Sequence, residues 1–293
     1  MLTKEQLQIR KQGIGGSEVA SVLGIDPFGS PYGVWMAKTG RSNVNVENKY
    51  TEAGRILEDA VAQYFAIKTG YKDLENPCKT FTHPNYSFAK GSPDRIITTM
   101  PGILECKTTQ RHHEDPPLNW FCQLQWYLGV MQMDKGAIAW LERGIDFQFR
   151  EYQFDDAFFT WMIGEVEKFW NENVLKDIAP DPVRVEDVEK IYSRHTDGKV
   201  VIAGDDMLMN VNELTEIRAN IKALEQREDE IVKKIKMYML DAETMMYKND
   251  RLVTWKTSKP SKKFDADAFA EENPGLYQKY LVEKEGSRRF LVK

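Results

Sequence analysis

The stretch KGSPDRIITTMPGILECKTT, residues 90–109, contains two β-prone segments on either side of Met100-Pro101-Gly102. A Pro-Gly pair between such segments is typical of a tight turn, so the sequence predicts an antiparallel hairpin. Side chains alternate along a strand, which puts Glu105 and Lys107 on the same face. The hairpin brings Asp94 to within about two residues of Lys107 across the ladder. Two carboxylates and an ammonium group are therefore expected at one end of a sheet.

Leu104 and Cys106 are expected to face a core on the other side of the strand. The charged cluster itself has two interpretations. The first is a solvated strand with a cross-strand ion pair. In the second, a divalent cation bridges Asp94 and Glu105, because buried and unpaired charges cost several kcal/mol each. Oxygen ligands without His or Cys favour Mg²⁺ or Mn²⁺. Lys107 would then hold or activate a water, or stabilise negative charge on a phosphate.

A third carboxylate lies on a predicted helix from about Glu47 to Thr69, where apolar residues recur at helical spacing before Gly70. Glu58 follows Gly54 by one turn, and a missing side chain at Gly54 would let the helix approach another backbone. Taken alone, Glu58 is an ordinary surface residue of a helix. Beside Asp94 and Glu105 it would complete a metal site.

The rest of the first 180 residues predicts helices packed on a mixed sheet, a single α/β core spanning about 1–180. Its expected helices cover residues 17–23, with Ser17 as N-cap, 30–40, 47–69, 117–132 and 155–171. Its expected strands cover 78–83, 86–99 and 102–109, followed by a hairpin of 136–142 and 145–154 that turns at Arg143-Gly144.

The prolines of IAPDPVRVED mark a boundary, after which residues 181–293 form a C-terminal extension. Apolar residues at alternating intervals of three and four predict a long helix over about 211–241. A small β unit of residues 251–259 and 288–293, with a helix at 265–273 between them, is expected to follow it. The role of the long helix is left open: it could pack on the core, dimerise or recruit a partner.

Composition limits the classes of protein that remain. Charged residues make up 29% of the 293 residues and the net charge is −5, so nucleic acid must be contacted through local basic patches. Three scattered cysteines, Cys78, Cys106 and Cys122, favour reduced thiols in a cytoplasmic compartment and argue against a zinc or iron–sulfur site. From the sequence we expect neither a membrane-spanning segment nor a signal peptide.

The combination of GRILEDA with Glu58, GSPD with Asp94, and LECK with Glu105 and Lys107 resembles the signature of the PD-(D/E)XK nucleases. The blocks IGGSEVASVLGIDPFGSPYGVWMAKTG and FCQLQWYLGV narrow the similarity, over about residues 8–170, to the YqaJ-like viral recombinases, the lambda-type or alkaline phage exonucleases. The resemblance implies a restriction-endonuclease-like α/β core, a mixed central sheet flanked by helices.

The same resemblance implies an activity: Mg²⁺- or Mn²⁺-dependent 5′→3′ digestion of one strand of linear double-stranded DNA, with two ions in each site. The remaining strand would pass to a single-strand annealing protein for recombination in the host cytoplasm. A ring-shaped homotrimer is expected as well.

Site roles are carried over residue by residue. Asp94 and Glu105 would be metal ligands together with the backbone carbonyl of Cys106, and Glu58 would hold a second metal or its water. Lys107 would orient the nucleophilic water. Gln123 takes the place of the active-site glutamine of the family; without the resemblance, an exposed helical amide is an equally good interpretation.

The N-terminal glycines Gly13, Gly15 and Gly16 precede the helix expected at Ser17. Helix N-termini present unpaired N–H groups to anions, and Arg10 adds a bidentate donor. The alternative is a plain glycine turn with a capping serine. Family resemblance assigns Arg10 and Ser17 to the 5′-terminal phosphate of the cut strand.

Other basic residues are weaker candidates for DNA contacts. Arg111 lies in the polar loop QRHHEDPP, expected to be mobile over the DNA, where adjacent His112 and His113 are poorly spaced to ligate one zinc ion. Lys256 and Lys259 belong to a basic run with two interpretations. The run could contact a DNA backbone, or it could be an ordinary solvated surface.

Three functions remain open at this point. The first is the exonuclease; the second is another nuclease of the superfamily, an endonuclease on branched or specific DNA. The third is a non-catalytic DNA-end binding or assembly protein. A Cas4-like nuclease would need a cysteine cluster that this sequence lacks.

Overall fold

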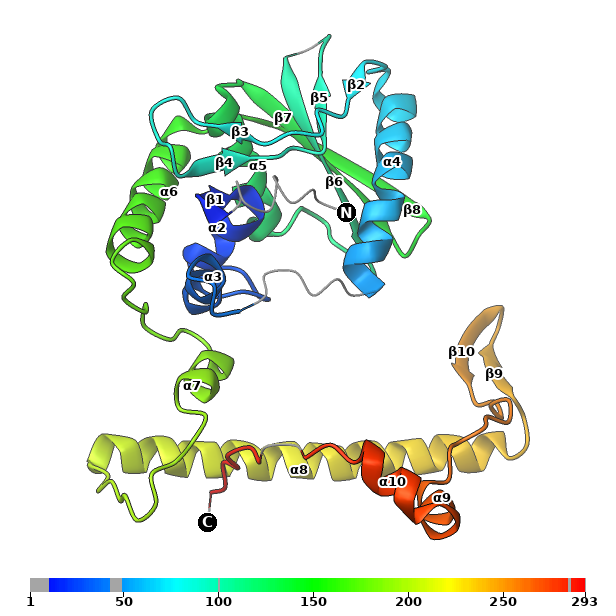
Figure 1. Ribbon diagram of the computed structural model, residues 1–293. Helices are drawn as coiled ribbons and strands as arrows, with labels where there is room; N and C mark the ends of the chain where they lie inside the picture. The colour runs from blue at the N-terminus through cyan, green and yellow to red at the C-terminus, as the bar shows by residue number, and fades with distance from the viewer. Residues whose placement is uncertain (1–10, 43–48, 100, 284–285, 293) are drawn as a thin grey trace. The chain divides into compact units, whose positions relative to one another are not determined.

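A computed structural model describes residues 11–42, 49–99, 101–283 and 286–292 (Figure 1). The chain separates into two compact units, Met1–Ile191 and Tyr192–Lys293, and each is described by itself. The domain limit expected at residue 180 stays a prediction. In the described part of the chain, every helix is too short or too polar to cross a bilayer.

The first unit is built on a five-stranded sheet in the order β2-β5-β6-β7-β8. β6 and β7 run parallel and the other neighbours antiparallel, so the sheet is mixed. Arg95 pairs with Leu104 in the β5–β6 ladder, as the hairpin at the Pro-Gly turn requires. The strands are β2 Leu74–Glu75, β5 Arg95–Ile97, β6 Gly102–Thr109, β7 Lys135–Glu142 and β8 Asp146–Gln153.

The single strand expected over residues 86–99 is wrong. The structure divides it into β4 (Ala89–Gly91) and β5, which belong to different sheets. The break falls at Ser92-Pro93-Asp94, because proline has no N–H to donate to a ladder. β4 joins β1 (Ile14–Gly15) and β3 (Phe81–Thr82) in a small second sheet.

Helices cover both faces of the central sheet, which confirms the predicted α/β class (Figure 1). On one face α4 (Lys49–Thr69) packs Phe65 against Leu104 and its neighbours, and on the other α5 (Leu118–Met131) packs against Ile103. Alternation along β6 thus gives each face its own core. The remaining helices of this unit are α2 Gly16–Val22, α3 Pro31–Lys38, α6 Asp156–Phe169, the π-helical turn η1 Trp170–Val174 and α7 Val185–Ile191.

Two expected details of the helices need correction. The N-cap of α2 is Gly15, whose N–H donates to Glu18 Oε2 at 2.8 Å, and Ser17 lies inside the helix. At Gly54, an added Cβ would come no nearer than 3.8 Å to the Thr108 hydroxyl, so no close backbone approach requires a glycine there. The start of α4 expected at residue 47 lies outside the described residues.

The N-terminal glycines allow close packing rather than flexibility. A Cβ on Gly13 would lie 2.2 Å from the Phe88 carbonyl oxygen, and one on Gly16 would lie 2.4 Å from the Tyr127 ring. Ile14 N–H donates to the same carbonyl at 2.7 Å, so the backbone cannot easily move away. Gly13 is therefore required for β1 to pair with β4.

Substituting Gly13→Ala is expected to destabilise the protein by about 1–3 kcal/mol, because the new methyl group overlaps backbone. The matched control is Gly164→Ala on α6, where nothing lies within 4 Å of an added Cβ. That change is expected to stabilise the helix by about 0.5–1 kcal/mol. Urea unfolding followed by circular dichroism measures both, and equal effects of the two substitutions would contradict the packing argument.

In the second unit the long helix α8 runs from Asp205 to Met239, so it begins six residues before the expected 211. Asp205 and Asp206 in its first turn favour this start through the helix dipole. The strand expected at 251–259 was predicted to form a β unit with residues 288–293, and this prediction is wrong. The observed strand β10 (Asp250–Thr254) pairs instead with β9 (Thr244–Tyr247). The described residues 286–292 contain no strand. α9 (Ala266–Glu272) and α10 (Pro274–Tyr280) complete the unit.

Candidate active site

A bonded trio of side chains lies between β6 and α5. Lys107 Nζ donates to Glu105 Oε2 at 3.0 Å and to Gln123 Oε1 at 2.9 Å. Gln123 Nε2 donates to the same Glu105 oxygen at 2.8 Å. Glu105 is completely buried, and the face of β6 that it shares with Lys107 is the one that α5 covers. Strand alternation and the helix that follows thus bring these three predicted residues together.

Asp94 lies beside Glu105 because it immediately precedes β5. Its Oδ2 accepts from the Cys106 N–H at 2.8 Å, and its own N–H lies 3.4 Å from Glu105 Oε1. In a strand, the N–H and C=O of one residue point to the same edge. The Cys106 carbonyl therefore points to the edge on which Asp94 lies, beyond the end of the β5 ladder at Arg95.

Glu58 approaches from α4 and is held by Arg95. The Arg95 Nη1 donates to Glu58 Oε1 and to the Asp94 carbonyl, both at 2.5 Å, and its Nη2 pairs with Asp59. The Arg95 side chain is 5% exposed, so this ion pair is largely sheltered from water. Glu58 is thus close to Asp94 but turned toward a guanidinium.

Burial and mutual repulsion of the acidic side chains shift the pKa values in the site. Burial, and next the charge of Asp94, raises the pKa of Glu105 to about 8. Burial also raises the pKa of Asp94, against the opposing effect of Lys107. Burial and the nearby Asp94 raise the pKa of Glu58. Burial alone would lower the pKa of Lys107, but Glu105 and Asp94 raise it. The acids hold protons tightly and the amine stays charged.

Asp94 and Glu105 fit a hard divalent cation by their chemistry. The pKa values of these two adjacent carboxylates stay raised despite the nearby Lys107, so their negative charge is incompletely compensated, and an ion such as Mg²⁺ would complete the compensation. The Cys106 carbonyl is a further oxygen at the same edge. The expected cage of three carboxylates is not assembled: among the described residues, no three His, Cys, Asp or Glu side chains are grouped as ligands of one metal ion. Arg95 accounts for this, because it holds Glu58.

Residues 5–134 match the YqaJ-like viral recombinase domain. The whole chain is 31% identical, over 309 aligned residues and 95% of the relative, to the uncharacterized protein YqaJ of Bacillus subtilis (strain 168). The chain belongs to the YqaJ-like viral recombinase family.

Solved structures share the fold of this YqaJ-like chain. The alkaline exonuclease LHK-Exo from Laribacter hongkongensis has a TM-score of 0.50 and 17% identity, covering 60% of this chain and 94% of that one. LHK-Exo in complex with dAMP also has a TM-score of 0.50, at 16% identity, covering 64% of this chain and 97% of that one. The restriction-endonuclease-like core expected from sequence agrees with this common fold.

The loop after β6 is anchored rather than free, contrary to expectation. Glu142 accepts from the His113 N–H at 2.8 Å and contacts His112 Nδ1 at 2.9 Å. Bonds from Trp140 Nε1, His113 and His112 lower the pKa of Glu142 to about 2. The two histidines thus anchor the loop in the YqaJ-like chain, and Arg111 in the same loop is exposed.

Of the two residues predicted to bind the 5′-phosphate, the structure describes Ser17. Arg10 lies outside the described residues, and Ser17 is exposed in the first turn of α2. That turn is next to the site, because Gly16 packs on Tyr127, whose hydroxyl lies 3.3 Å from Gln123 Nε2. Lys256, which pairs with Glu243 at 3.2 Å, and Lys259 both belong to the second unit.

Sequence reasoning missed Arg95, Tyr127 and Glu142. Tyr127 had a signal, since it follows Gln123 by four residues on one helix face. Glu142 follows Trp140 by two on a strand, which places both on the same face. For Arg95 no pattern was available, because its guanidinium reaches a carboxylate 37 residues earlier in the chain.

Proposed function

We propose that this YqaJ-like recombinase is a divalent-metal-dependent nuclease that digests one strand of linear double-stranded DNA in the 5′→3′ direction. The observation that carries the proposal is the bonding of Lys107, Glu105 and Gln123 beside Asp94. Placing a fully buried acid, with a mostly buried amine and an amide, within β6 and α5 costs free energy of desolvation, which favours a functional over a purely structural role.

The proposed mechanism assigns each residue a task. Asp94, Glu105 and the Cys106 carbonyl would hold Mg²⁺ or Mn²⁺, and Glu58, once released from Arg95, would join them or hold the water of a second ion. When bound, the cation polarises the phosphate and makes a coordinated water more acidic. Lys107 donates a hydrogen bond to the attacking water and stabilises the charge that develops on the phosphate.

Gln123 fixes the position of the amine. It accepts from Lys107 and donates to Glu105, so the ammonium cannot rotate away from the acids. Tyr127 in turn lies against Gln123 and against the first turn of α2. Through this path, a DNA end held at α2 would be adjacent to the reacting phosphate.

The DNA contacts and partners extend the same proposal. Arg10 and Ser17 bind the 5′-terminal phosphate, and Arg111, Lys256 and Lys259 contact the DNA backbone. A single-strand annealing protein receives the remaining strand, and the nuclease unit assembles as a ring trimer around the duplex. The 5′-phosphate residues, the annealing partner and the ring rest on family resemblance, whereas Arg111, Lys256 and Lys259 are proposed from their positive charge.

The test is digestion of end-labelled linear duplex DNA with Mg²⁺, compared with a closed circle of the same sequence. We expect the linear duplex to lose 5′ nucleotides, faster from 5′-phosphorylated than from 5′-hydroxyl ends, and the circle to stay intact. Cutting of the circle would instead support an endonuclease. Binding of ends with no cleavage in Mg²⁺ or Mn²⁺ would support an assembly protein. Addition of EDTA is the control for metal dependence.

A further inference from the structure

Helix α8 carries a largely apolar stripe that repeats every 3.5 residues. The intervals alternate between three and four residues from Met207 to Tyr238, over more than four heptads. Such a repeat is typical of a left-handed coiled coil. The stripe, called the seam below, consists of Met207, Asn210, Leu214, Ile217, Ile221, Leu224, Glu228, Ile231, Ile235 and Tyr238.

Most of the seam is exposed, and only Leu214 and Ile235 are half-buried. The exposed fractions of its apolar side chains include 46% for Ile217, 50% for Ile221, 65% for Leu224 and 48% for Ile231. Helix α8 has 35 residues, so it is about 52 Å long at ~1.5 Å per residue. A contiguous apolar surface of this length marks an interaction site.

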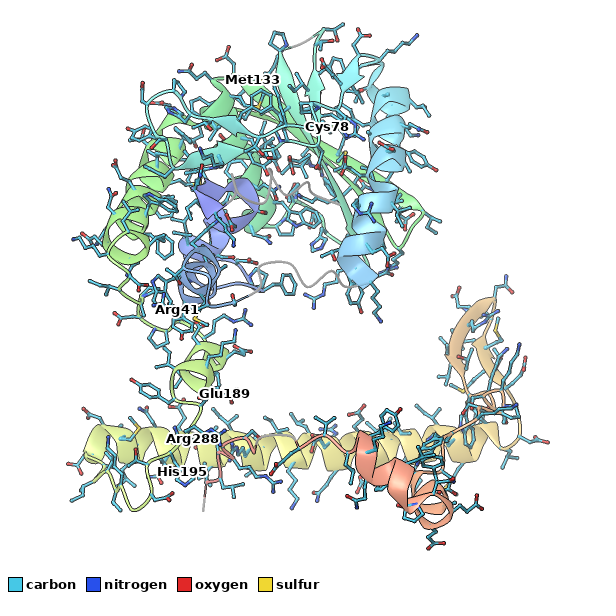
Figure 2. All side chains as sticks on the ribbon, in the orientation of Figure 1. Arg41, Cys78, Met133, Glu189, His195 and Arg288 are labelled. Carbon is cyan, nitrogen blue, oxygen red and sulfur yellow. The ribbon has the colours of Figure 1, made fainter. Side chains whose placement is uncertain are left out.

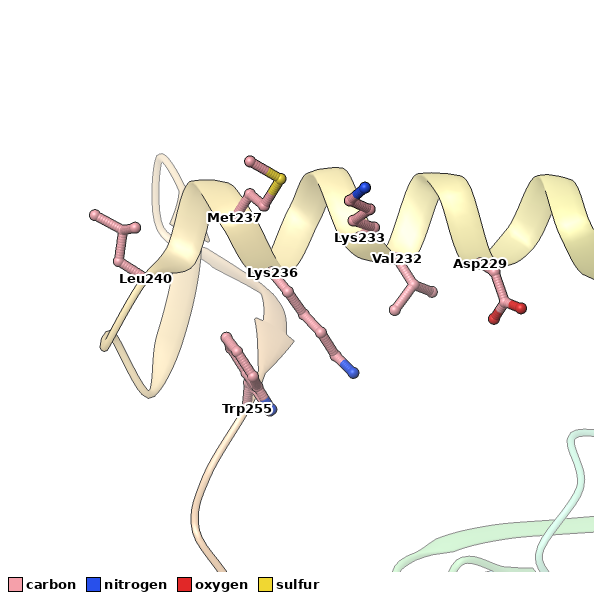
Figure 3. Close-up of a pocket in the computed structure, with 7 residues that line it drawn as sticks. All are labelled: Asp229, Val232, Lys233, Lys236, Met237, Leu240 and Trp255. Carbon is pink, nitrogen blue, oxygen red and sulfur yellow. The ribbon is translucent and has the colours of Figure 1, made fainter.

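The unit covers one edge of the seam with its own segments. Lys236 Nζ lies 5.4 Å from the centroid of the Trp255 ring (Figure 3), and Met239 is buried. At the other end, the Arg218 guanidinium lies 5.7 Å from the Phe290 ring. A groove near these contacts, mainly on the outer face of α8, has a volume of about 470 Å³ and is lined by Asp229, Val232, Lys233, Lys236, Met237, Leu240 and Trp255.

The C-terminal segment that carries Phe290 is tied down near the start of the unit. Arg288, labelled in Figure 2, donates from Nη1 to the Tyr192 carbonyl at 2.8 Å. The opposite edge of the seam carries only exposed polar side chains, which are Asp206, Glu213, Asn220, Arg227 and Lys234. A partner helix therefore meets the seam and this charged edge.

We propose that the seam binds the seam of a second copy of this chain, as an antiparallel two-stranded coiled coil centred on Ala219. In this register Ile217 faces the partner's Ile221, and Leu214 faces the partner's Leu224. Knobs-into-holes packing of these side chains buries surface that is exposed in the single chain. This inference does not depend on the proposed nuclease activity.

The polar members of the seam decide the orientation. A parallel pair would set Glu228 against the partner's Glu228, two like charges in an apolar interface. In the antiparallel register, Glu228 faces the partner's Asn210, whose amide can donate to the carboxylate. A shift by one heptad would put Glu228 against the partner's Ile217 and leave it without a bond.

The charged edge supports the same register. Antiparallel helices align their charged edges, so Glu213 lies opposite the partner's Arg227 and Asp206 opposite the partner's Lys234. Each pair occurs twice by symmetry, giving four opposite-charge contacts. Such flanking pairs set partner choice and orientation in coiled coils.

The first test measures the mass of the full-length protein by light scattering over a range of concentrations. We expect the unaltered chain to associate in even numbers, as dimers or as paired ring trimers, and Ile217→Asp with Leu224→Asp to halve the mass. Both side chains are exposed, so circular dichroism should show an intact helix in that variant. Ala219→Asp, on the outer face of α8, is the control and should keep the full mass. A monomer at all concentrations, or an unchanged mass, would overturn the proposal.

The second test reverses charges. Glu213→Lys is expected to raise the dissociation constant of the pair about tenfold, since it turns two attractive contacts into repulsive ones. Adding Arg227→Glu should restore the original constant, because the reversed pair attracts again. Restoration by Arg218→Glu instead, which is the edge partner in a parallel pair, would refute the antiparallel arrangement.

Discussion

Replacing Glu105 with glutamine is expected to lower cleavage of linear duplex DNA by about a thousandfold, because a proposed metal ligand loses its charge. Glutamine has nearly the same shape and keeps an oxygen for Lys107, so the fold should persist. Initial rates with end-labelled DNA measure the loss. The matched control is Glu165→Gln, which changes an exposed acid on α6 and should leave the rate unaltered.

Metal binding distinguishes a ligand from a structural acid at this position. The pKa of Glu105 is about 8 without a cation, so below pH 8 the metal must displace its proton. The affinity of the unaltered protein for Mn²⁺ should thus rise as the pH rises from 6 to 8, by up to about tenfold per unit for one released proton. Glu105→Gln should bind weakly with no such rise, as calorimetry would show. A variant that cleaves normally would disprove the proposed site.

Much of this site was predictable from sequence because its parts are local. Glu105 and Lys107 are two residues apart on one strand, and alternation alone puts them on one face. The Pro-Gly turn fixes the ladder that returns Asp94 to Glu105. Gln123 needed the resemblance, since nothing in the periodicity of its helix separates an inward amide from an exposed one.

The predictions that were wrong concern contacts between segments that are distant in the sequence. Arg95 pairs with Glu58 beside Asp94, and this competition between a guanidinium and a metal ion for one carboxylate leaves no periodic pattern in the sequence. The break at Pro93 was visible as a proline, but the two short strands around it pair with different sheets. The same limit applies to β9, whose partner is set by a turn at Lys248, with φ of 51°, rather than by strand composition.

Lys107→Met is expected to lower cleavage by about a hundred- to a thousandfold while leaving metal binding intact. Methionine fills a similar volume but cannot donate to water, to Gln123 or to Glu105. The positive charge of Lys107 opposes a cation at Asp94 and Glu105, so its removal should keep Mn²⁺ affinity equal or raise it. Calorimetric titration with Mn²⁺, beside rate measurements on linear DNA, separates these two effects.

Whether Lys107→Met raises or lowers the affinity for Mn²⁺ decides the role of the amine. Without Lys107, both protons and cations gain attraction for the two acids, but a divalent ion gains about twice as much as a proton. A ligand residue behaves in the opposite way, because its loss weakens metal binding and catalysis together. Lys135→Met at the start of β7 removes a lysine outside the trio and should change neither quantity. If Lys107→Met abolished Mn²⁺ binding, the amine would be a structural support of the acids and its role toward the attacking water would be lost.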